Sequence, residues 1–182
     1  MSISKWMSWE AGVDLAAMTT AGMSMPNIIV HVARMVHTPV GSAPAGMILY
    51  APNAAAPTVM GFVSTNRKVA EYFGPNIFAG TPFEKAPILD ASIDVDIAAA
   101  YATASVRVAG HVFEVRLSKF RPIETINRPS MAMTPFTQQG LEASADDATL
   151  TVNGIAATFV LPPVGLGGGA AAVYSPAGVY AR

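Results

Sequence analysis

The sequence predicts a mainly β domain (β-rich α+β), built as an antiparallel, closed or nearly closed β-barrel with one or two short helices. Short stretches rich in β-branched residues recur along the chain, and turn residues separate them. Two of these turns, Ala109-Gly110 and Asn153-Gly154, join such stretches at hairpin spacing. The strand–helix alternation that builds a parallel sheet is missing from the pattern. These observations favour a barrel or sandwich over a doubly wound fold.

Length and composition predict a single domain over residues 1–182. Its first part, 1–24, is expected to be an N-terminal helical arm, and 25–182 to form the barrel. Charged residues make up only 13% of the chain, against about 25% in typical globular domains. We therefore expect part of the surface to be hidden, most simply in a homo-oligomer.

The arm is predicted from one helical face. Trp6, Trp9 and Val13 are spaced as i, i+3 and i+7, within a helix expected from about Ser4 to Met18 and ended by Gly22. Two roles are open for the tryptophans. They could cover the core or a partner, or they could stack on a ligand.

Strands are expected next. Residues 27–33 and 58–64 are apolar and β-branched, and 47–50 follows a loop expected at 39–46. Ser64 or Thr65 would then cap a short helix over 66–73, which Gly74-Pro75 would end.

The second half contains the clearest strand patterns. Residues 92–97 alternate strictly, with Ile93, Val95 and Ile97 on one face. The remaining strands are expected as two hairpins and a final strand, at 102–108 with 111–117, 149–152 with 155–161, and 170–174.

Charge and cysteine content limit the partners and the chemistry. The net charge is −1 without any block of like charges, so neither nucleic acid nor membrane is expected as a partner. The chain has no cysteine, which removes disulfides and thiolate chemistry. We expect no cofactor and a cytoplasmic location.

Two possible ligand motifs were tested against their structural requirements. Residues 165–170 fit G-x-G-x-x-A, but the helix, second strand and acidic residue of a dinucleotide site cannot follow in so short a remainder, so a loop near the barrel mouth is expected. The histidines His31, His37 and His111 lack metal-ligand spacing, and no metal is expected. Their assembly with Asp94 or Asp96 stays open as an alternative.

The irregular segment 74–87 is the best candidate for a site. It combines glycines and prolines with Phe78 and Phe83 and the adjacent pair Glu84 and Lys85. It could be a packed crossover loop with both charges in solvent. Alternatively, Lys85 or Glu84 could face a pocket whose apolar walls shift its pKa.

The order of features around this segment resembles the acetoacetate decarboxylase family. The features are Thr81 to Leu89, the strands up to Val115, and the run Asn127 to Met133, which includes Arg128-Pro129; upstream, Ile48 to Asn53 and Val59 to Gly61 look like the family's preceding strand pair. The resemblance spans roughly 100 residues. It implies a barrel whose cavity binds a small keto acid or related carbonyl compound, with a methionine-containing strand after Arg128.

The family uses a lysine that forms a Schiff base, and its neutral amine is maintained by a second cation in a dry pocket. Here Phe83 and Glu84 stand at the family's lysine pair, and Lys85 follows one residue later. A slip of one residue in an extended segment reverses the side chain's direction.

Two functions follow from this resemblance. The first is an enzyme, decarboxylase- or lyase-like, with Lys85 and Glu84 as catalytic residues. Arg116, Arg128, Phe83 and Phe78 would bind the substrate, the arginines as carboxylate clamps. The second is a non-catalytic small-molecule-binding or oligomeric structural protein that has lost the lysine chemistry. A lipocalin-like carrier shares the expected architecture but not the order of features.

Overall fold

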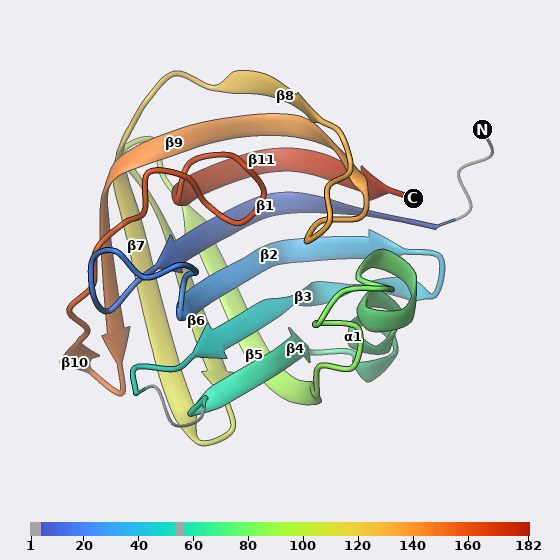
Figure 1. Cartoon of the computed structure of the whole chain (residues 1–182), viewed down its shortest axis with the longest axis horizontal. Helices are drawn as coiled ribbons and strands as arrows, with labels where there is room; N and C mark the ends of the chain where they lie inside the picture. The colour runs from blue at the N-terminus through green and yellow to red at the C-terminus, as the bar shows by residue number, and fades with distance from the viewer. Residues whose placement is uncertain (1–4, 54–56) are drawn as a thin grey trace.

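The described residues form a large curved sheet whose strands close into a ring, with one short α-helix beside it (Figure 1). The computed structural model describes residues 5–53 and 57–182. The elements in chain order are β1 (Trp6–Ala17), β2 (Ile28–Thr38), β3 (Gly41–Tyr50), β4 (Val59–Ser64), α1 (Arg67–Tyr72), the π-helical turn η1 (Phe73–Ile77), β5 (Ile88–Ile97), β6 (Tyr101–Val108), β7 (His111–Phe120), β8 (Glu124–Arg128), β9 (Thr137–Val152), β10 (Ile155–Ala156) and β11 (Ala172–Ala181).

The ring closes through β9. The strands follow the order β9-β11-β1-β2-β3-β4-β5-β6-β7, and β7 pairs again with β9. The first half of this long strand pairs with β8 and β11, and its second half with β7 and β10. The prediction of a mainly β fold is therefore confirmed.

One strand pair departs from the expected antiparallel pattern. Strands β4 and β5 are parallel, whereas the other strand pairs of the described residues are antiparallel. Parallel neighbours need a crossover connection, and here α1, η1 and the segment up to residue 87 supply it. Helix α1 packs against β3, β4 and β5.

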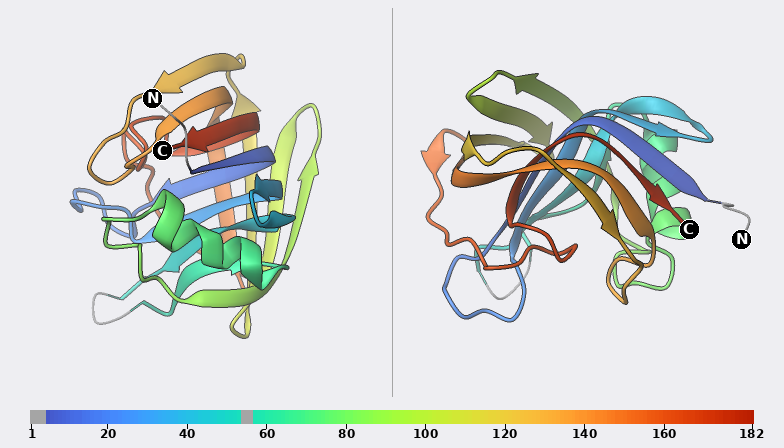
Figure 2. Two further views of the ribbon diagram at one scale, coloured as in Figure 1. Left: turned by 90° about the vertical axis from the view of Figure 1, so that its right-hand side faces the viewer. Right: turned by 90° about the horizontal axis from the view of Figure 1, so that it is seen from above.

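Strands β1 to β4 carry apolar side chains on both faces, and this creates two cores. Val30 and Val32 point into the ring, where they join a cluster that includes the inward residues of β6 and β7. Ile29 and Ala33 point the other way, into a second cluster with α1 and η1. In the left view of Figure 2, β6 and β7 lie on one side of these strands, and α1 and the long loops lie on the other. Both the site and the segment 74–87 belong to this second side.

The prediction of an N-terminal helical arm is wrong. Trp6 to Ala17 form β1, which lies between β11 and β2 in the sheet. A strand that is buried on both faces shows no alternation, so its apolar positions can match helical spacing by coincidence. Trp9 is buried and Trp6 is exposed on this strand. Residues 1–4, which belonged to the expected arm, lie outside the described residues.

Four further local predictions are corrected. Residues 41–46, expected in a loop, belong to β3, and residues 130–133, expected in a strand, form a loop after β8. The α1 cap is Asn66, whose side chain accepts a hydrogen bond from Lys68 N at 3.1 Å, rather than Ser64 or Thr65. The helical path also continues past Gly74-Pro75 as η1.

The elements after residue 100 agree better with the prediction from the sequence. The hairpin at Ala109-Gly110 is confirmed, and the turn at Asn153-Gly154 joins β9 to the very short β10. Strand β9 begins twelve residues earlier than expected, and β11 continues to Ala181. Within residues 5–53 and 57–182, no helix has the length and apolarity needed to span a membrane.

Candidate functional site

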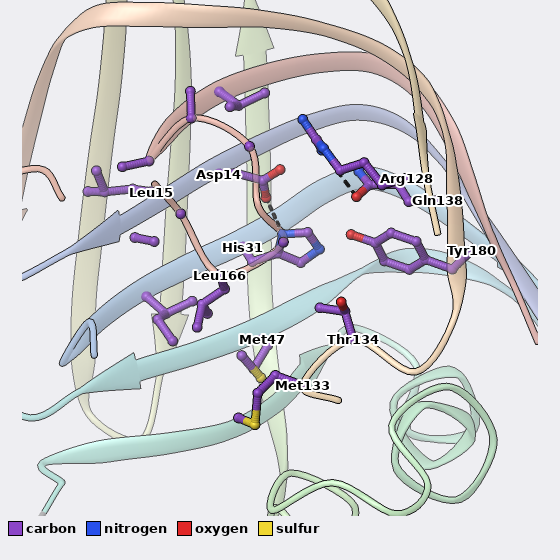
Figure 3. Close-up of a pocket in the computed structure, with 18 of the residues that line it drawn as sticks. Asp14, Leu15, His31, Met47, Arg128, Met133, Thr134, Gln138, Leu166 and Tyr180 are labelled. Atoms are coloured by element: carbon purple, nitrogen blue, oxygen red, sulfur yellow. Dashed lines mark hydrogen bonds and ion pairs between the residues drawn. The ribbon is translucent and has the colours of Figure 1, made fainter. Parts of the chain in front are cut away.

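A cavity of about 100 Å³ opens on the second side of the sheet, outside the ring. Its floor is formed by β1, β2, β3 and β11, and three loops at 78–83, 133–136 and 165–171 surround it (Figure 3). Most of its wall is apolar, contributed by Leu15, Ile29, Met47, Phe78, Phe83, Phe136, Leu166 and Val173. Its polar side chains are Asp14, His31, Arg128, Thr134, Gln138, Glu142 and the hydroxyl of Tyr180.

The sheet register places Asp14 directly opposite His31. The two residues are paired across β1 and β2, so their side chains leave the same face of the sheet. His31 Nδ1 forms an ion pair with Asp14 Oδ1. This oxygen is buried and has no other polar partner among the described residues. The second ring nitrogen of His31 faces away from Asp14, on the side of Tyr180 (Figure 3).

The pairing changes the proton affinity of His31. Burial by itself would lower the pKa of His31, but the charge and hydrogen bonding of Asp14, together with the charge of Glu142, raise it above 6.5. Although His31 lies deep in the fold, about a third of its side chain (34%) is accessible, and that side chain lines the cavity. Because Nδ1 must carry a proton to face Asp14, Nε2 accepts a hydrogen bond in the neutral ring and donates one in the charged ring.

A second ion pair lies beside the first. Arg128 donates to both oxygens of Glu142, at 2.7 Å from Nη1 and 2.6 Å from Nη2. Gln138 donates to Glu142 at 3.0 Å and accepts from Arg128 at 3.2 Å. The side chain of Glu142 is only 10% exposed. Hydrogen bonding to Glu142 raises the pKa of Arg128 further, so the guanidinium stays charged.

Tyr180 brings a neutral hydroxyl to the same place. Burial and the charges of Asp14 and Glu142 raise the pKa of Tyr180 well above 10. Its ring packs against Phe136, with ring centroids 4.0 Å apart, and against Trp9 at 4.6 Å. This packing fixes the direction of the hydroxyl group.

A smaller pocket of about 20 Å³ adjoins the cavity behind Asp14, His31 and Tyr180. This volume has room for about one water molecule.

The expected site residues divide into two groups. Phe78, Phe83 and Arg128 line the cavity, whereas Glu84, Lys85 and Arg116 are not part of its wall. Lys85 and Glu84 are exposed, and Glu84 accepts a hydrogen bond from Gly80 N at 2.6 Å. Arg116 is exposed on β7 and stacks over the Tyr101 ring at 4.0 Å.

The alternative metal site is not formed. Asp94 and Asp96 are exposed on β5, on a different strand pair from His31. In the part of the chain that the structure describes, no three or more acidic or histidine side chains gather as metal ligands would. The glycine-rich segment is a loop, as expected, and it precedes a strand rather than a helix.

Four important residues were not among the predicted site residues, namely Asp14, Gln138, Glu142 and Tyr180, and His31 was weighed only as a metal ligand. A signal in the sequence existed for Asp14 and for His31. Asp14 is the single ionisable residue of the stretch 11–17, and His31 is the single ionisable residue of 28–33; these otherwise apolar stretches lie within β1 and β2. A lone charge in a buried strand calls for a partner, and the two strands are neighbours in sequence.

The chain matches no protein-family model, no curated protein and no solved structure. Its function is therefore argued from the geometry of the cavity.

Proposed function

We propose that the cavity binds a small carbonyl compound and that His31 is its acid–base group. The observation that carries this proposal is the Asp14–His31 pair, which places a partly accessible imidazole in the wall of a largely apolar cavity. A carboxylate that orients a histidine is a recurring arrangement in proton transfer.

The size of the cavity supports a small ligand. An apolar cavity of roughly 150 Å³ holds benzene, which has six non-hydrogen atoms, so about 100 Å³ suits a molecule of roughly four to six non-hydrogen atoms. Apolar walls with a few converging polar groups are typical of such sites. Phe78, Phe83 and Phe136 would contact the carbon chain. Tyr180 would face the carbonyl oxygen, and His31 would face the carbon next to the carbonyl.

The polar groups suit proton transfer next to a carbonyl. With its neutral Nε2, His31 would take a proton from the carbon beside the carbonyl. The neutral Tyr180 hydroxyl would donate a hydrogen bond to the oxygen on which negative charge develops. The product is an enol or enolate, and return of the proton to carbon restores the ketone.

The acetoacetate decarboxylase resemblance supports the ligand class and the finer fold, a closed barrel of that family's kind. It supports the Schiff-base step less, because Lys85 is exposed and outside the cavity wall. The proposal therefore uses no lysine nucleophile. Reduction of a mixture of protein and acetoacetate with borohydride is expected to leave Lys85 unmodified.

A non-catalytic binding protein is the second candidate. It is favoured by the same exposure of Lys85, and it requires only that the cavity hold a ligand. A homo-oligomer and a cytoplasmic location remain predictions from composition. Exposed apolar side chains such as Ile155 (74%) and Val164 (54%) support a covered surface.

The experiment is an NMR titration of the labelled protein with pentan-2-one, followed by deuterium exchange into the ketone in D₂O. We expect the ketone to shift the resonances of residues around the cavity, and the protein to accelerate exchange at the carbons next to the carbonyl. His31→Gln is expected to abolish the exchange. His37→Gln is the matched control, because His37 also lies on β2 and pairs with a carboxylate, Glu10 at 3.1 Å, but on the surface.

The outcomes separate the candidates. Binding without exchange would support the non-catalytic protein. No perturbation of cavity resonances by pentan-2-one would refute the proposal, and equal loss of exchange in both histidine variants would remove His31 from its role.

A further inference from the structure

We infer that the cavity selects an uncharged carbonyl compound over a carboxylate of the same size and shape. This inference rests on the proposed function and narrows its ligand class. It departs from the keto acid that the family resemblance implies.

The first argument is that Arg128 is already occupied. Both of its terminal nitrogens donate to Glu142, and Nη1 also donates to Gln138. The loop covers the guanidinium from another side, because a Cβ at Gly169 would overlap Nη2 and Cζ. A ligand carboxylate could reach the bidentate position only by displacing Glu142.

The second argument is the cost of that displacement. Glu142 is nearly buried, and its partners are Arg128 and Gln138. A carboxylate that loses its cation in such a place is strongly destabilised. The ligand would gain one ion pair while the protein lost another, so the exchange yields no net attraction.

The third argument is the charge of the whole cavity. Its ionisable side chains are Asp14, His31, Arg128, Glu142 and Tyr180. Two carboxylates face one arginine and one histidine, so the sum is zero when His31 is charged and −1 when it is neutral. Tyr180 adds no positive charge in either state. A ligand carboxylate would therefore leave water without an excess cation to receive it.

An uncharged carbonyl meets no such obstacle. Its oxygen can accept from Tyr180, whose raised pKa keeps the hydroxyl protonated at alkaline pH. It can also accept from His31 Nε2 when that ring is charged. Its carbon chain would contact the phenylalanine walls.

The test compares pentan-2-one with butanoate. These two molecules have the same number of non-hydrogen atoms and nearly the same shape, and they differ in a methyl group against a charged oxygen. Dissociation constants come from the chemical shifts of cavity residues at pH 7.5. We expect the ketone to bind at least about tenfold more tightly than butanoate, the discrimination that one uncompensated charge supplies at the lower limit.

The variant Glu142→Gln provides an independent arm. It removes the internal partner of Arg128, so we expect butanoate to bind about tenfold more tightly than it does to the wild type. The control is Glu114→Gln, which changes the net charge equally on the exposed face of β7. We expect no change of affinity for either molecule in this control.

The binding results distinguish the inference from the proposed function. Butanoate binding as tightly as pentan-2-one to the wild-type protein overturns the inference and leaves the proposed function intact. Binding of neither molecule at the cavity refutes both. The wild-type comparison suffices if the Glu142 variant does not fold, as judged from its amide spectrum.

Discussion

The Arg128–Glu142 pair makes a quantitative prediction about stability. Replacing Arg128 by methionine keeps most of the side-chain volume and removes the cation. Glu142, with 10% of its side chain exposed, then keeps a carboxylate whose remaining hydrogen bond comes from Gln138. Breaking a buried pair in this way costs about 3–5 kcal/mol. Because Arg128 is partly exposed (23%), we expect a loss of about 3 kcal/mol.

The double variant R128M/E142Q separates the lost pair from the orphaned charge. Its amide carries no charge and can still hydrogen-bond to Gln138, so most of the loss is expected to be recovered. Replacement of both partners of a buried pair by uncharged groups is often nearly neutral. We expect the double variant to lie within about 1.5 kcal/mol of the wild type.

The assay is urea unfolding followed by tryptophan fluorescence. The R128M midpoint should fall with an unchanged slope, and a melting temperature lower by roughly 6–12 °C should accompany it in a protein of this size. The control is Arg121→Met, which breaks an exposed pair with Asp146 at 2.9 Å and should cost less than about 1 kcal/mol. A loss in R128M no larger than in this control would refute the argument from burial, and so would a double variant less stable than R128M.

Two further predictions concern packing and pH. Gly46→Ala should cost at least about 3 kcal/mol or prevent folding, because the added Cβ would overlap the backbone of His31 in the neighbouring strand. The control is Gly167→Ala, where the atom nearest to the added Cβ lies at 3.6 Å. Equal losses of stability in urea unfolding would contradict the steric argument. The raised pKa of His31 should stabilise the protein fully below about pH 6.5, the unfolded value, and this contribution should disappear as pH rises through the folded pKa. The difference in unfolding free energy between wild type and His31→Gln should therefore shrink with rising pH in that window. A difference that grows with pH would refute the assignment.

Sequence reasoning reached the fold class because local signals and tertiary pairing agree in much of the chain. The turn at Ala109-Gly110 joins two strands that pair with each other, so local chemistry was sufficient there. It failed for β1, whose two faces are both covered by other parts of the chain. Burial on both faces removes the alternation from which a strand is recognised.

The predicted residues that reach the cavity came from two kinds of signal: Arg128 from the family resemblance, and two phenylalanines from a dense local pattern. Phe78 and Phe83 belong to an apolar, proline-rich segment, and both reach the cavity. Lys85 belongs to the same segment but is exposed. In an irregular loop, the spacing of residues in the sequence does not predict which way a side chain points. Tyr180 and Glu142 come from β11 and β9, far from that segment in the sequence.

The sequence by itself determined that the chain would build strands, where its tightest turns would fall, and which chemistry its lack of cysteine excludes. Only the tertiary structure decided which ionisable side chains meet. Asp14 faces His31 because the register of β1 and β2 sets them opposite each other, and Arg128 reaches Glu142 because β8 pairs with β9. Register depends on the burial of whole strand faces and is therefore a property of the assembled sheet.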